Sequence, residues 1–214
     1  MIREFDLDAP EAAKPKRIQF RDQTRCVTAL VERCYKRSKE TGKPWKILVE
    51  VVDRVVRPDC IDLLGVLTIQ VPDDVESFLR LENAEKKPKT LDLLMTGVEK
   101  VAKARSLDLA PFESAAEEVR RLGFINEWVW KSRVANRSQT MFADIVVNHE
   151  IDAATLSARI RDPSGDLVGH FPLVSDRPNE FGFDKYFGTV AWLDDRTIEL
   201  TSRDGEKRYL ASVP

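Results

Sequence analysis

The sequence predicts an α+β protein with an N-terminal helix, two strands and a helical hairpin, followed by a C-terminal antiparallel β-sheet meander. Two observations carry this prediction. Before about residue 126, apolar residues recur every three or four positions in three segments, as they do on one face of a helix. From residue 127 onward the apolar spacing falls to two, which is typical of half-buried strands.

Residues 1–16 show no apolar periodicity and contain two prolines, so we expect a flexible arm there. An N-terminal α/β lobe is then expected over residues 17–126 and a C-terminal antiparallel β lobe over 127–214. A chain of 214 residues is long enough to bury a sizeable core. We expect the two lobes to share one core.

The first regular element is a predicted amphipathic helix over residues 22–41, with Asp22 as its N-cap and a glycine and a proline after its end. Its two cysteines belong to the apolar stripe, which favours a packing role for both. The stripe consists of Cys26, Val27, Leu30, Val31, Cys34 and Tyr35.

Two runs rich in β-branched residues follow, at 45–56 and 60–71, and a proline turn separates them. The alternation in the second run indicates a half-solvated antiparallel strand, so we expect the two runs to be adjacent strands. A short helix is expected after Pro72. Two further helices, beginning near Thr90 and Pro111, form the predicted helical hairpin.

The C-terminal part contains seven short segments with alternating apolar residues, joined by turn-forming sequences. Their regular spacing predicts an antiparallel meander. The seven predicted strands are residues 128–134, 141–148, 155–161, 167–174, 189–193, 197–202 and 207–211.

The charge of the chain is unevenly distributed, although the net charge is only −2. Residues 14–46 contain eleven basic and three acidic side chains, so this segment carries +8 and the remainder −10. The small total argues against a whole-surface nucleic-acid or membrane binder. The acidic remainder is suited to a basic partner.

No secretory signal or membrane-spanning run is recognised, and the three cysteines have no C-x-x-C spacing. We therefore expect a cytoplasmic protein with reduced thiols and no membrane partner.

Catalytic and metal-binding motifs of specific spacing are not found in the sequence, so we predict no catalytic residue, no metal site and no cofactor. His149, Glu150 and Asp152 lie close in the chain, and we interpret them as a solvated strand end. His170 fits the alternation of a strand, which favours a structural role.

The pairs Asp73–Asp74 and Asp194–Asp195 are interpreted as helix-capping and turn residues.

The most unusual segment is the loop from Ser175 to Gly188, because long loops between strands often carry function. We expect one or two of its aromatic side chains to contact a protein partner and its acidic side chains to form a charged rim. The alternative is that the rings fold under the loop and close one end of the sheet. The candidate partner-binding residues are Phe181, Phe183, Tyr186 and Phe187, with Glu180 and Asp184.

These observations favour a non-enzymatic cytoplasmic protein-binding module with an unidentified protein partner, an inhibitor or immunity-type protein being one form of it. One alternative is a small-molecule enzyme of unidentified class. Another is a nucleic-acid-associated protein that uses the basic helix at 22–41 to neutralise phosphates. The residues that would do so are Arg33, Lys36, Arg37, Lys39 and Lys43.

Overall fold

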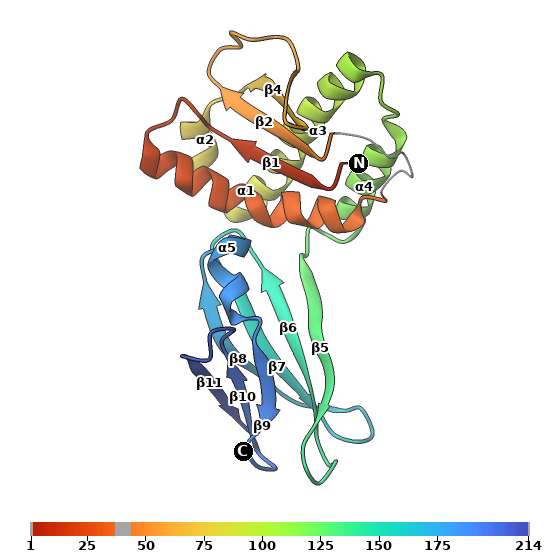
Figure 1. The fold of residues 1–214 in the computed structure, drawn as a ribbon, viewed down its shortest axis with the longest axis vertical. Helices are drawn as coiled ribbons and strands as arrows, with labels where there is room; N and C mark the ends of the chain where they lie inside the picture. Colours follow the sequence, from red (N-terminus) through yellow and green to blue (C-terminus); the bar gives the residue numbers. More distant parts are fainter. Residues whose placement is uncertain (1, 37–43, 214) are drawn as a thin grey trace. The chain divides into compact units, whose positions relative to one another are not determined.

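The computed structural model describes residues 2–36 and 44–213. Internal contacts divide the chain into two compact units, Met1–Asn126 and Glu127–Pro214. The predicted α+β class is confirmed, with helices and a small sheet in the first unit and antiparallel sheets in the second (Figure 1). No helix among the described residues is long and apolar enough to span a membrane.

The N-terminal unit is built on a four-stranded sheet of order β1-β2-β4-β3. Its strands are β1 (Glu4–Asp8), β2 (Lys46–Val52), β3 (Ile61–Leu63) and β4 (Val66–Pro72). Strands β1, β2 and β4 are parallel, whereas β3 is antiparallel to β4.

The flexible arm predicted over residues 1–16 is wrong, because β1 lies within it. Phe5 and Leu7 of this strand are fully buried, and β1 pairs with β2 along its whole length. A strand of five residues is too short for its alternation to stand out against the flanking polar residues and prolines.

The run at 60–71 is a hairpin rather than one strand, and its pairing with the run at 45–56 is parallel rather than antiparallel. Leu64 and Gly65 both have positive φ, 53° and 85°, which is the backbone of a tight two-residue hairpin turn. The side chain of Asp62 accepts a hydrogen bond from the Gly65 N–H at 3.0 Å. Because the chain reverses here a second time, β4 runs in the same direction as β2.

Four helices complete this unit: α1 (Lys14–Cys34), α2 (Val75–Arg80), α3 (Asn83–Arg105) and α4 (Ala110–Arg121). The first differs from the predicted helix at 22–41. It begins eight residues earlier than Asp22 because Pro15 occupies its first turn, where the missing N–H costs nothing. It ends at Cys34, and residues 37–41 of the prediction lie outside the described residues.

Helix α3 begins at Asn83 rather than at the predicted cap Thr90. Pro88 lies inside the helix, which normally disfavours helical structure there. The carboxylate of Glu85 accepts a hydrogen bond from the Glu82 N–H at 3.0 Å, and this contact stabilises the first turn ahead of the proline.

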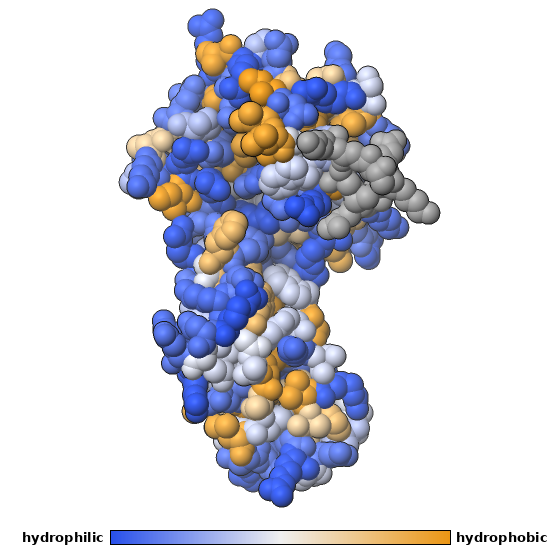
Figure 2. Space-filling view, viewed as in Figure 1, coloured by the Kyte–Doolittle hydropathy of each residue, from blue (hydrophilic) through white to orange (hydrophobic). Residues whose placement is uncertain are grey.

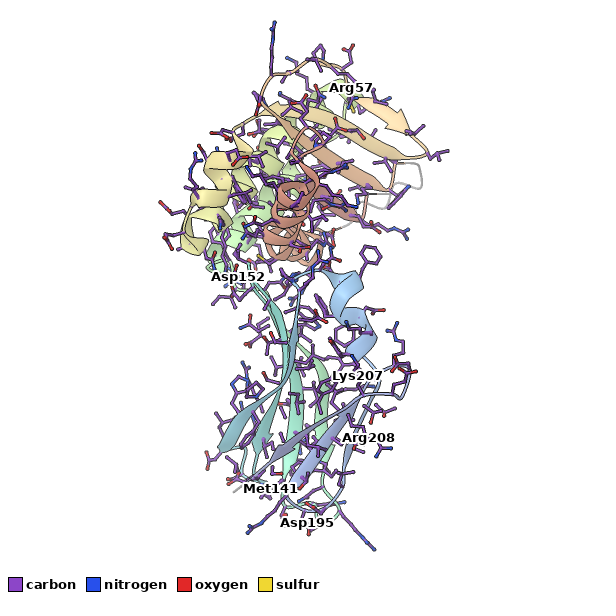
Figure 3. All side chains as sticks on the ribbon, turned by 90° about the vertical axis from the view of Figure 1, so that its left-hand side faces the viewer. Arg57, Met141, Asp152, Asp195, Lys207 and Arg208 are labelled. Carbon is purple, nitrogen blue, oxygen red and sulfur yellow. The ribbon has the colours of Figure 1, made fainter. Side chains whose placement is uncertain are left out.

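One face of the sheet is buried beneath α1 and α3, which lie together on one side of it (Figures 1 and 3). Alternate strand residues point to this face, and those that are almost fully buried include Phe5, Leu7, Ile47, Val49, Leu67 and Ile69. Helix α3 approaches β2 closely at Gly97, where a Cβ atom would lie 2.3 Å from Val49 Cγ2.

The opposite face of the sheet is polar, since its side chains pair with one another. Lys46 Nζ lies 3.0 Å from Asp6 Oδ2 across β1 and β2. Arg57, from the segment after β2, lies 2.7 Å from Glu50 Oε2. This face therefore presents neutralised charge rather than a continuous apolar surface.

The C-terminal unit contains all seven predicted strands. They are β5 (Glu127–Ala135), β6 (Phe142–His149), β7 (Ala154–Arg161), β8 (Leu167–Asp176), β9 (Thr189–Trp192), β10 (Thr197–Thr201) and β11 (Arg208–Ser212). The first four form one antiparallel sheet and the last three form another. The meander is thus split into two sheets by the segment at 177–188.

The two sheets pack face to face, because their inward residues form common clusters. One cluster joins β6 and β7 to β10 and β11, through Ala143, Ile145, Ala158, Ile160, Ile198, Ala211 and Val213. A second cluster at the other end joins β6, β7 and β10 to the 177–188 segment. Both clusters consist of residues of this unit, which is therefore described by itself.

We expect Gly97→Ala to destabilise the N-terminal unit by about 1 to 3 kcal/mol, because the new methyl group would overlap Val49. Helix propensity alone predicts the opposite sign, a gain of up to about 1 kcal/mol. Urea unfolding measures the difference, with the exposed neighbour Thr96→Ala as a control. A Gly97→Ala variant as stable as the parent would contradict the close helix–sheet contact.

Candidate functional site

The segment at 177–188 connects the two sheets of the C-terminal unit and contains a helical turn, α5 (Glu180–Phe183), followed by the 3₁₀ turn η1 (Asp184–Tyr186). Asn179 caps this turn by accepting a hydrogen bond from the Phe181 N–H at 3.0 Å. At the end of the segment, a Cβ atom on Gly188 would lie 2.2 Å from the Thr201 carbonyl oxygen, so only glycine fits there.

Three of the four aromatic residues predicted to bind a partner point inward. Phe183 is 1% exposed and Tyr186 5%, so these two of the four candidates present almost no surface to a partner. Phe187 is half-buried, with its ring centroid 5.0 Å from that of Trp130. The three rings follow at positions 183, 186 and 187, a spacing that places them on one face of a helical turn.

Phe181 points the other way, and its side chain is 94% exposed. It lies off the helical face defined by its three aromatic neighbours, so it cannot join their cluster without unwinding the turn. Burial of Phe183 and Tyr186 therefore fixes the backbone from which Phe181 projects.

A polar cluster also fixes this segment to the end of β8. The carboxylate of Asp176 accepts hydrogen bonds from the Tyr186 hydroxyl at 2.6 Å and from Lys185 Nζ at 2.8 Å. Burial raises the pKa of Asp176, but the hydrogen bonds from Lys185, Tyr186 and the Arg177 N–H outweigh it and lower the pKa to about 2. Burial and the contact with Asp176 raise the pKa of Tyr186 to about 12.

The two acidic residues of the predicted rim differ in their surroundings. Asp184 is paired with Arg203 through two hydrogen bonds, of 2.6 and 3.1 Å, so its charge is locally neutralised. Glu180 lies directly beside Phe181 in α5 and is partly exposed. Both residues thus lie in or next to the turn that carries the exposed ring.

His149 is fully buried, which corrects its interpretation as part of a solvated strand end. Its Nε2 lies 3.0 Å from the Pro178 carbonyl oxygen, so this nitrogen carries the proton and donates it to the segment that bears Phe181. The ring also packs edge-on against Phe183, with centroids 5.3 Å apart. Its role is therefore to hold the aromatic segment in place.

Only part of the predicted nucleic-acid-binding set falls on described residues. Arg33 Nη1 donates a hydrogen bond to the buried Asn126 at 2.5 Å, while Lys36 follows the end of α1. Arg37, Lys39 and Lys43 lie outside the described residues. The structure thus gives Arg33 an intramolecular bond that binds the end of α1 to the end of this unit.

A cleft of about 770 Å³ lies between the end of α1 and α4. Its charged lining residues Glu118 and Arg121 form a pair with two hydrogen bonds, of 2.7 and 2.5 Å. Cys34 also lines the cleft, and burial, followed by the nearby Glu118, raises the pKa of its thiol. A raised pKa favours the protonated thiol, which is a weaker nucleophile than the thiolate.

The remaining sequence candidates have local structural roles. Asp74 caps α2 by accepting a hydrogen bond from the Glu76 N–H at 2.9 Å, and Asp194 accepts two backbone hydrogen bonds in a turn. His170 is exposed on β8. Among the described residues, no group of three or more His, Cys, Asp or Glu is placed to hold a metal ion.

Known proteins give no guide to the function of this chain, so a functional proposal must rest on its geometry. The chain matches no protein-family model, no curated protein and no solved structure. The feature that local structure explains least is the exposed ring of Phe181, because Phe183, Tyr186 and Phe187 all pack inward.

We expect Asp176→Asn to lower the free energy of unfolding by roughly 1 to 2 kcal/mol at pH 7. A carboxyl group whose pKa falls to about 2 on folding stabilises the folded protein above its ordinary pKa. This contribution is lost as the pH falls from about 4 to about 2. Urea unfolding of both proteins at pH values from about 2 to 7 measures this contribution. The difference between their free energies of unfolding should disappear at the low end of this range. A difference that is independent of pH would contradict the assigned cluster, and Glu206→Gln, at an exposed position, is the control.

Proposed function

We propose that this chain is a non-enzymatic, cytoplasmic protein-binding module that contacts its partner through Phe181. The observation that carries the proposal is the 94% exposure of this ring on a turn whose other aromatic residues are packed inward. An exposed phenyl group leaves a large apolar area in water, and that area becomes favourable to binding once a partner covers it.

The turn is suited to binding because it is ordered before any partner arrives. Phe183 and Tyr186 are buried, Asn179 caps the helix, and Asp176 receives hydrogen bonds from two residues of the segment. Ordering a loop on binding costs free energy, and a preformed turn avoids that cost. An aromatic ring with two side-chain torsions also loses little entropy when it is fixed.

Charge indicates the chemistry of the partner. The C-terminal unit has 14 acidic and 11 basic residues, a net charge of −3, and Glu180 lies next to Phe181. A partner with an apolar pocket bordered by Lys or Arg would match both features. An inhibitor or immunity-type protein is one kind of module that acts in this way, and the three unbridged cysteines are consistent with a reducing compartment.

We expect Phe181→Ala to leave stability within about 0.5 kcal/mol of the parent while weakening partner binding by roughly 2 kcal/mol or more. The full-length protein, immobilised, is used to enrich binding proteins from an extract of its own cells, with bound proteins quantified against Phe181→Ala. Leu210→Ala, at a position 57% exposed on β11, is the matched control and should retain binding.

A second comparison separates a binding role from a structural one. Phe183→Ala removes a ring that is 1% exposed and should cost roughly 3 to 5 kcal/mol of stability. If Phe181→Ala destabilises the protein to the same extent, the ring is structural and the proposal fails. It also fails if Phe181→Ala is stable and retains every partner that the parent protein enriches.

A further inference from the structure

The cleft of about 770 Å³ in the N-terminal unit lies where the end of α1 meets α4 (Figure 1). This volume is within the range of roughly 300 to 1,000 Å³ that is typical of small-molecule sites. Figure 2 shows hydrophobic side chains as separate patches on an otherwise hydrophilic surface of this unit. Apolar surface that a ligand could cover is therefore local, and in this cleft it lies beside fixed charges.

One side of the cleft is an apolar wall formed by Leu30, Tyr35 and Leu122. Leu30 is 1% exposed, and Leu122 is half-buried. The ring of Tyr35 stacks on that of Phe112, with centroids 4.9 Å apart, and meets the ring of Phe5 edge-on at 5.3 Å. Because these contacts hold the Tyr35 ring in place, the wall is formed before any ligand arrives.

The guanidinium group of Arg33, which also lines the cleft, is held in position by a chain of two hydrogen bonds. Arg33 Nη1 donates to Asn126 Oδ1 at 2.5 Å, and Asn126 Nδ2 donates to the Cys26 carbonyl oxygen at 2.8 Å. Asn126 is 1% exposed, so this support is buried. A planar guanidinium group held in this way matches the geometry of a carboxylate.

The charges that line the cleft leave a positive balance. Three basic residues, Arg33, Lys36 and Arg121, accompany two acidic residues, Glu117 and Glu118, for a net charge of +1. Glu118 is neutralised by Arg121 through two hydrogen bonds. The hydrogen bond from Arg121 lowers the pKa of Glu118, and the nearby charge of Lys36 also lowers it. An anionic group of a ligand is therefore favoured here over a cationic one.

We propose that this cleft binds a small carboxylic acid with an apolar tail, its carboxylate paired with Arg33 and its tail along the apolar wall. The fixed cation selects the head group, and the area of the wall that is covered selects the tail. This site belongs to the N-terminal unit and uses none of the residues around Phe181, so the two proposals succeed or fail separately.

The test titrates the full ¹⁵N-labelled chain with hexanoate, which should shift the amide resonances of residues 30–36 and 114–122. Hexan-1-ol and hexylamine have the same tail and should bind at least about threefold more weakly, because neither presents a carboxylate to Arg33. Butanoate has the same head group and should bind at least about fourfold more weakly, since its tail is two methylene groups shorter.

Two variants test the two parts of the site. Arg33→Gln should weaken hexanoate binding roughly threefold or more and reduce its advantage over hexan-1-ol. Arg54→Gln, at an exposed position after β2, is the matched control and should bind normally. Ser114→Trp places a large ring in the cleft from an exposed position on α4 and should remove binding, whereas Thr96→Trp, exposed on α3, should retain it.

The proposal is overturned if no resonance of the cleft shifts at about 20 mM hexanoate, or if hexylamine binds as tightly as hexanoate. It is also overturned if Ser114→Trp is folded and binds hexanoate like the parent. This last comparison decides the matter even if Arg33→Gln, which loses the hydrogen bond to Asn126, does not fold.

Discussion

Each sheet in this protein must bury one apolar face, and the rest of each unit is arranged to meet that requirement. In the N-terminal unit the face is covered by helices, and the close approach of α3 to β2 depends on Gly97, where no side chain could fit against Val49. In the C-terminal unit the cover is a second sheet, and clusters of small and branched residues join the two layers. In both units, this cover leaves strand edges and strand ends that other residues must shield from solvent.

That protection differs from one edge or end to another. The β1 edge is closed by the pair Arg25–Glu32 of α1, whereas β3 is left with exposed apolar side chains. One end of the C-terminal sandwich is filled by the rings of Phe183 and Tyr186. The segment that supplies these rings also carries Phe181, which contributes nothing to the same cluster.

The aromatic segment combines buried rings with one exposed ring in a few residues. Rings at 183, 186 and 187 stabilise the end of the sandwich, and His149 and Asp176 tie the same segment to β6 and β8 through hydrogen bonds. The backbone fixed in this way holds Phe181 outward at little entropic cost. Loss of the inner rings would therefore affect folding, whereas Phe181 contributes no buried contact to the sandwich.

The sequence by itself determined the seven strands after residue 127, because period-two alternation reports directly which residues face a core. It also identified the aromatic segment at 175–188. The spacing of the four rings places Phe181 on the opposite side from the other three only if the segment is helical, as the structure shows for Glu180–Phe183. Only the tertiary structure decided that residues 4–8 join a sheet, that β2 and β4 are parallel, and that β3 lies at the edge beside β4. Periodicity records burial along one segment, whereas the partner and direction of a strand depend on residues far away in the chain.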